Sequence, residues 1–178
     1  LNIGFTFYYN GQAYTQFGVN ANGYIGFGNL LVSSQNVISS GIVNNVISAL
    51  NYDLAAQTGA DIQYQTIGAA PNRTLVVQWT KYRAFGIVGD NLNFQIRLSE
   101  GTNSINVRYG LCTSTGVHAS QTGIKGASNV DFNNRYVSDT VNTWATSQDG
   151  TSDTNICVIN SIFRPANGQT FSWLPPTP

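Results

Sequence analysis

The stretch that decides the fold is a hairpin signal near the start of the chain. It reads Gln16-Phe17-Gly18-Val19-Asn20-Ala21-Asn22-Gly23-Tyr24-Ile25-Gly26-Phe27-Gly28. Phe17 and Val19 alternate with small or polar residues, and a second β-prone run follows in residues 24–27. The Asn-Gly pair between the two runs accepts the left-handed backbone of a tight turn. This stretch predicts a two-stranded antiparallel hairpin and carries no chemistry of its own.

The rest of the chain repeats this pattern of short strands joined by polar turns. Apolar side chains alternate with polar ones in residues 3–8, 61–66 and 92–98, and residues 73–82 form the strongest predicted strand. Residues 30–45 are predicted to be a long connection with a short strand at residues 37–38. No segment has the periodicity of an amphipathic helix. These patterns predict an all-β, antiparallel, jelly-roll-like β-sandwich with long polar loops.

Length and composition fit one domain with few charges. The 178 residues are 42% hydrophobic, so we expect one folded domain over residues 1–174 and a Pro-rich linker from residue 175 to 178. Charged residues make up 9%, with eight basic and eight acidic side chains and no basic stripe. Nucleic acid is therefore not an expected partner. No run approaches the roughly 20 apolar residues of a membrane span, so membrane insertion is not expected either.

The two cysteines and the single histidine limit the possible redox and metal chemistry. In a charge-poor, Asn- and Thr-rich chain of exported type, Cys112 and Cys157 are predicted to form a disulfide that closes a loop of about 45 residues. Two free buried thiols are the alternative. His118 lies in a loop-like stretch and is predicted to be a surface histidine. No CxxC spacing accompanies it, so we expect no metal site and no cofactor.

Candidate catalytic and binding residues are few. The spacing of the carboxylates singles out no pair for glycoside hydrolysis, and His118 has no flanking nucleophile motif, so no catalytic residue and no enzyme activity are expected. Aromatic residues are numerous, and Tyr52 and Trp144 are candidates for stacking on a sugar ring. The alternative is that they belong to the core of the sandwich or to a sheet face.

Five short motifs and the end of the chain resemble a known family. The motifs are Ile3-Gly4-Phe5, Asn22-Gly23-Tyr24-Ile25, Asp53-Leu54, Ala70-Pro71-Asn72-Arg73 and Phe94-Gln95-Ile96-Arg97-Leu98, with the ending in residues 164–171. Together they resemble a nidogen-like extracellular β domain. The version most similar is found in secreted and surface proteins of the Bacteroidetes, often beside fibronectin type III modules and a sorting domain for type IX secretion.

The resemblance implies a non-catalytic extracellular module of a secreted or cell-surface protein, with an adhesive or structural spacer role. Its expected partners are other domains of the same chain and a glycan or protein on a surface. A carbohydrate-binding module attached to a hydrolase is one alternative. A self-assembling filament subunit that uses strand addition is another, because family members carry a strand ahead of Ile3. Asp139-Thr140-Val141 resembles the O-glycosylation sites of Bacteroidetes, with Thr140 as acceptor.

Overall fold

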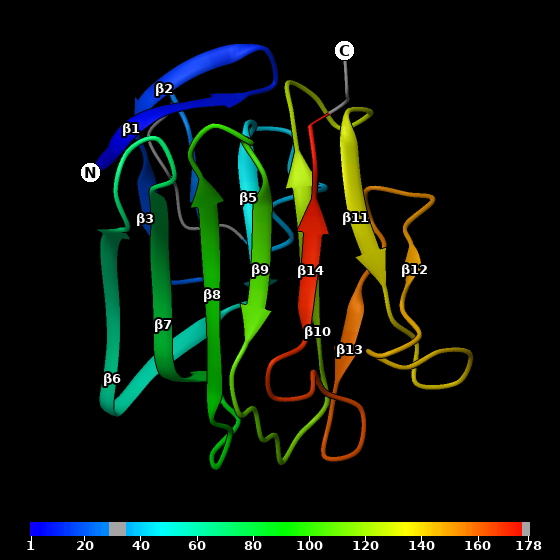
Figure 1. Ribbon diagram of the computed structural model, residues 1–178. Helices are drawn as coiled ribbons and strands as arrows, with labels where there is room; N and C mark the ends of the chain where they lie inside the picture. Colours follow the sequence, from blue (N-terminus) through cyan, green and yellow to red (C-terminus); the bar gives the residue numbers. More distant parts are fainter. Residues whose placement is uncertain (29–34, 176–178) are drawn as a thin grey trace.

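The computed structural model describes residues 1–28 and 35–175, and its regular elements are all β-strands. The strands form two facing sheets, with a separate hairpin across one end (Figure 1). The predicted all-β antiparallel sandwich is therefore confirmed. Residues 29–34, which include the start of the predicted connection, and residues 176–178 of the predicted linker lie outside the described residues.

The front sheet in Figure 1 has five strands in the order β14-β9-β8-β7-β6. The bounds are β6 Leu54–Ile67, β7 Thr74–Ala84, β8 Leu92–Ser99, β9 Ile105–Tyr109 and β14 Thr170–Trp173. Side chains along β8 alternate strictly between buried and half-buried. This follows from the period of two in a strand, which places the apolar set inside and the polar set on the solvent side.

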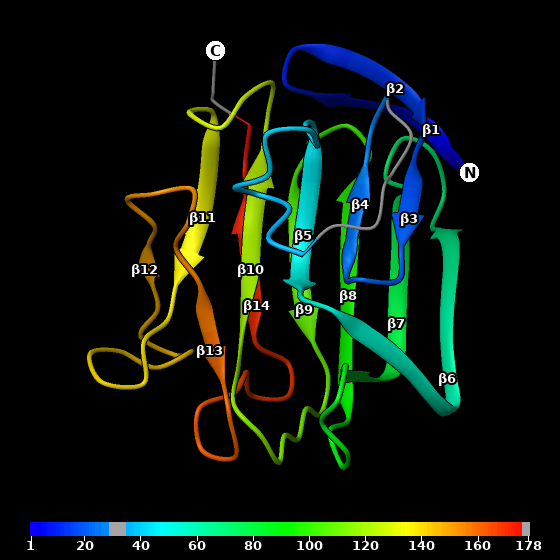
Figure 2. The same ribbon diagram turned by 180° about the vertical axis from the view of Figure 1, so that it is seen from behind.

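The back sheet follows the path β12-β11-β10-β5-β4-β3, and β13 also pairs with β10 (Figure 2). The bounds are β3 Gly18–Asn20, β4 Tyr24–Gly26, β5 Val46–Asn51, β10 His118–Lys125, β11 Phe132–Tyr136, β12 Gln148–Asp149 and β13 Cys157–Ile159. All of β5 is buried. Ile47, Ala49 and Leu50 of β5 belong to the core between the sheets, and Val46 packs on the other side against Val37, Ile38 and Val43.

The hairpin predicted from residues 16–28 forms in the back sheet. Gly18 lies opposite Gly26, and Asn20 lies opposite Tyr24. Gly23 has a φ of 81° and completes the turn. Its carbonyl accepts hydrogen bonds from the amides of Ala49 and Leu50, at 3.0 and 3.4 Å. The turn thus closes the hairpin and also joins it to β5.

The hairpin of β1 (Asn2–Tyr9) and β2 (Gln12–Gln16) lies across one end of the sandwich (Figures 1 and 2). Side chains from the front sheet bond to its backbone. Thr66 donates to the carbonyl of Ile3, and Arg73 donates to the carbonyl of Gly4. These bonds occupy backbone carbonyl groups of the first strand and join the hairpin to the front sheet.

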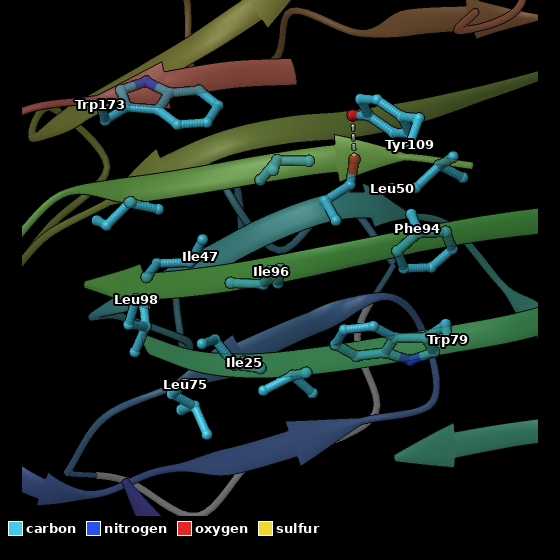
Figure 3. Close-up of a cluster of buried hydrophobic side chains, with 14 of the residues drawn as sticks. Ile25, Ile47, Leu50, Leu75, Trp79, Phe94, Ile96, Leu98, Tyr109 and Trp173 are labelled. Atoms are coloured by element: carbon cyan, nitrogen blue, oxygen red, sulfur yellow. Dashed lines mark hydrogen bonds between the residues drawn. The ribbon is translucent and has the colours of Figure 1, made fainter. Parts of the chain in front are cut away.

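The main core lies between the sheets and is built from the inward side chains of both (Figure 3). Trp79 of β7 stacks on Phe94 of β8 with ring centroids 5.1 Å apart, and its indole nitrogen donates to the carbonyl of Asn20. The Tyr109 hydroxyl donates to the carbonyl of Ala49 in β5 at 2.6 Å. Both polar atoms are thereby satisfied, as buried Trp and Tyr require.

A second, smaller core lies on the far side of the back sheet, where Tyr24 and Val46 contact residues 37–38. Val37 and Ile38 lie in a turn, so the strand predicted there is wrong. The Val37 amide donates to Oδ1 of Asn51, and the Ile38 amide donates to Oε1 of Gln121, both at 2.7 Å. Side-chain acceptors replace the ladder bonds of a strand, which allows this apolar segment to be buried outside the sheet.

Candidate functional site

An open groove of ≈ 870 Å³ lies on the outer face of the front sheet. It is lined mainly by outward side chains of β6, β7, β8 and β9. One row across the sheet consists of Gln63, Gln78, Gln95 and Arg108, each opposite the next in the strand register. Because directly opposite residues point to the same side of a sheet, the topology gathers these polar side chains on one surface.

The glutamines of this row form a directed chain of hydrogen bonds. Gln95 donates to Oε1 of Gln78 at 2.6 Å, and Gln78 donates to Oγ1 of Thr80 at 3.0 Å. At the sheet edge, Gln63 donates to Asp61 at 2.8 Å. These bonds orient the amides, which carry both donors and acceptors and therefore suit the hydroxyl groups of a ligand.

Two arginines in the groove make no ion pair or hydrogen bond with any described residue. Arg97 lies opposite Asn106, and Arg108 lies opposite Gln95. No Asp or Glu occurs among the described residues that line the groove. By contrast, Arg73, directly before β7, makes two side-chain bonds to Glu100, at 2.5 and 2.7 Å. The Arg73 bonds lower the pKa of Glu100. The groove therefore keeps two positive charges for a ligand.

Strands β7, β8 and β9 present no outward aromatic side chain to the groove. The outward positions of β7 and β8 hold Thr, Val, Gln, Lys, Asn, Arg and Ser, and those of β9 hold Asn and Arg. Their Trp, Phe and Tyr side chains point inward, into the core. Over these three strands, recognition must therefore use hydrogen bonds and charge rather than ring stacking. Tyr64 of β6 also lines the groove, where it is 48% exposed and packs edge-on against Phe17.

The two predicted stacking residues lie elsewhere. Trp144 is buried, donates to the carbonyl of Val158 at 2.8 Å and packs edge-on against Tyr109. It belongs to the core, so its proposed role as a ligand platform is corrected. Tyr52 is half-buried, and its ring lies 5.0 Å from the ring of His118. Neither residue lines the groove.

Thr140 is exposed in a turn of the connection between β11 and β12. Its hydroxyl lies 2.9 Å from that of Ser138. The position leaves room for a glycan, and the modification itself stays a prediction.

Cys112 and Cys157 are free, buried thiols, which corrects the predicted disulfide to the alternative of two separate thiols. Each sulfur has its own backbone acceptor: Cys112 donates to Asn93, and Cys157 donates to Arg135, both at 3.4 Å. Burial raises the pKa of Cys112 to about 11 and that of Cys157 to about 12. The thiolate needed for disulfide chemistry is therefore strongly disfavoured.

His118 is not a surface residue, and that prediction is wrong. Its side chain is fully buried at the start of β10, with Nδ1 3.8 Å from Oδ2 of Asp90. Neither ring nitrogen bonds to a described residue. Asp90 is itself held by the amides of Ala84 and Thr115. Burial lowers the pKa of His118, an effect that the nearby Asp90 opposes. The imidazole is a buried neutral group rather than an accessible base.

The buried imidazole predicts a pH-dependent stability. Because its folded-state pKa is lowered, His118 binds a proton less readily in the native state than in the unfolded chain, where histidine titrates at about pH 6.5. We expect the free energy of unfolding to fall as the pH drops from 7.5 to 5, measured by urea denaturation. His118 is the sole histidine, so the free energy of unfolding of the His118→Gln variant should not fall over this pH range. The difference in free energy of unfolding between the variant and the wild type should therefore become smaller at low pH. Parallel pH profiles would contradict the assignment.

Within residues 1–28 and 35–175, no group of three or more His, Cys, Asp or Glu side chains is placed to hold a metal ion. The same residues contain no helix of the length and apolarity needed to cross a membrane.

Sequence reasoning found part of the groove and missed its centre. The alternation of residues 92–98 predicts one wet face, which is the face that carries Gln95 and Arg97. The rows formed with Gln63, Gln78 and Arg108 depend on strand order and register, which a single sequence does not give. The sequence signal that could have located the groove was the run of polar residues at the outward positions of several long strands.

Comparisons with known proteins gave one match. A family model described as NIDO related matches residues 1–175, a range that includes both sheets, the end hairpin and the groove. The comparison with curated proteins gave no match, and neither did the comparison with solved structures.

Proposed function

Since the chain belongs to the NIDO-related family, we propose that it is a non-catalytic extracellular module of a secreted or cell-surface protein. The membership confirms the resemblance to a nidogen-like domain at the level of the family. The module's proposed role is adhesion, with other domains of the same longer protein and a glycan or protein on a surface as partners.

The groove on the front sheet is the observation that carries this proposal. A rigid sheet holds its side chains in fixed rows, and these rows offer oriented amides and two arginines without acidic partners. Such a face suits ligand binding, because neither aligned hydrogen-bond donors nor unpaired charges on the surface are required to hold the sheet together. A pure spacer role is therefore the weaker interpretation.

Several groups that catalysis could use have structural roles here. His118 is enclosed beside Asp90, and Glu100 is held by Arg73. A general acid or base must reach the substrate, and these groups are fixed by the fold instead. They support a domain that binds without catalysing.

The proposal also includes an extracellular location for the protein. Low charge, abundant Asn and Thr and the family resemblance support export through type IX secretion in a member of the Bacteroidetes, beside fibronectin type III modules. Exposed Thr140 supports O-glycosylation there. Net neutrality leaves no broad basic surface for nucleic acid, and no role in membrane insertion is proposed.

Two alternatives each have one observation in their favour. The polar groove would also suit a carbohydrate-binding module attached to a hydrolase, and a neighbouring hydrolase domain would identify it. The 14-residue strand β6 lies at the edge of the front sheet, as a filament subunit using strand addition would need. Concentration-dependent fibres in sedimentation velocity would favour the filament.

We expect the purified domain to bind a glycan- or protein-coated surface without converting its ligand. Labelled domain should be retained on the surface, and chromatography of a glycan and peptide panel should show no product. Two variants that each replace one Asp by Asn are compared: Asp61→Asn at the groove edge, and Asp139→Asn in the loop between β11 and β12 as its control. Turnover that Asp61→Asn abolishes and Asp139→Asn preserves would overturn the non-catalytic role.

A further inference from the structure

We propose that the groove on the front sheet binds an acidic polysaccharide and that Arg97 and Arg108 hold the carboxylate of a uronic acid unit. This inference rests on the proposed binding function and names its ligand class. The two arginines supply the charge, and the glutamine row supplies the contacts to sugar hydroxyls.

The register brings the two guanidinium groups into one neighbourhood. Arg97 of β8 lies opposite Asn106, and Arg108 of β9 lies opposite Gln95, so the arginines are diagonal neighbours on the same face. Diagonal Cα atoms on adjacent strands are about 7–8 Å apart, within reach of long side chains. Both arginines line the main groove and also a smaller hollow of ≈ 260 Å³ beside it. A single anionic group can therefore contact both.

The charged side chains of this face favour a negatively charged ligand. The other described arginines are engaged: Arg73 with Glu100, Arg135 with Asp149, and Arg83 and Arg164 with backbone carbonyls. Arg97 and Arg108 have no such partner among the described residues. Asp61, at the β6 edge, accepts a bond from Gln63 and does not line the groove. Two unpaired guanidiniums in a groove without acids attract a negatively charged ligand.

The neighbouring side chains favour a sugar over a peptide. Tight peptide and protein contacts centre on buried aromatic anchors, and no aromatic side chain stands outward on β7, β8 or β9. Gln78 and Gln95 instead present amides, which donate and accept at once and so match hydroxyl groups. The planar fork of arginine matches a carboxylate in two-bond geometry. Hydroxyls beside a carboxylate are the pattern of a uronic acid.

The proposal predicts a binding difference that calorimetry measures directly. Tetragalacturonic acid should bind the whole domain, and the same oligosaccharide with its carboxyl groups reduced to alcohols should bind at least about tenfold more weakly. Arg97→Gln and Arg108→Gln should each weaken the acidic ligand about tenfold, because each removes a charge-assisted contact while keeping a polar side chain. Raising the salt concentration should weaken binding further.

Controls separate a specific site from general charge. Arg164→Gln removes the same charge outside the groove and should leave affinity unchanged, and thermal melting of each variant checks that it folds. Equal binding of the reduced oligosaccharide, equal binding of poly-glutamate, or unchanged affinity in the double arginine variant would overturn the inference. Absence of acidic-sugar binding, with surface retention intact, would overturn it and leave the proposed adhesive function standing. Turnover of the sugar would instead overturn the non-catalytic function, while loss of binding in the arginine variants would still support the site.

Discussion

Replacing Gly23 with alanine is expected to lower the free energy of unfolding by about 4 kcal/mol, measured by urea denaturation. Two costs combine at this position. The φ of 81° is unfavourable for a residue with a Cβ atom, and that atom would lie 2.5 Å from the carbonyl oxygen of Leu50. The carbonyl oxygen of Leu50 belongs to the backbone of β5, so relief of the clash must move the strand. This movement would stretch the two hydrogen bonds that the Gly23 carbonyl accepts.

Gly11 offers a matched control for the Gly23 prediction. It also has a positive φ, 72°, but a Cβ built there meets nothing within 4 Å. Gly11→Ala should therefore show the backbone cost alone, about 1 kcal/mol. The difference between the two variants isolates the contact between the turn and β5. Equal losses in both would show that the close approach to Leu50 is unimportant.

Lys125→Met is expected to destabilise the domain by about 3–5 kcal/mol. Lys125 is fully buried near the end of β10. Its ammonium group donates to the backbone carbonyls of Ser40 and Val43. A third bond reaches Oδ1 of Asn129 at 2.7 Å. Methionine fills the space of the stem but leaves these acceptors buried without a donor, which is costlier than losing an exposed bond.

The matched control is Lys81→Met, since the sequence contains two lysines and Lys81 is exposed in β7. We expect this change to alter the free energy of unfolding by less than about 0.5 kcal/mol. Both variants remove one positive charge, so the comparison removes any effect of net charge. Similar midpoints for the two variants would mean that the bonds of Lys125 contribute little.

Local patterns were sufficient to predict the class of fold. The Asn-Gly turn before Tyr24 and the alternation along residues 92–98 depend only on neighbours within a few positions, and both appear in the structure as predicted. The family resemblance was also carried by such local motifs, and the match over residues 1–175 confirms it at the level of the family. A period of two fixes which side chains share a face, and this information is present in the chain itself.

Composition and spacing predicted neither the free thiols of the two cysteines nor the burial of Trp144. Spacing along the chain gives no distance between Cys112 and Cys157, and the fold gives each sulfur a separate acceptor. Trp144 lies in a polar stretch that suggested exposure. Its burial comes from Tyr109 and Phe171, which belong to two strands of the front sheet.

The sequence by itself determined the strands, the turns and the polar side of each strand, because these follow from backbone preferences and the two-residue period. Only the tertiary structure decided which polar residues are buried and which meet in the groove. Lys125 takes a partner 85 positions away, and His118 is enclosed beside Asp90. Arg97 and Arg108 share a face because β8 and β9 pair in one register. Burial and charge pairing depend on neighbours in space, and strand order, which supplies those neighbours, is a property of the whole chain rather than of any local stretch.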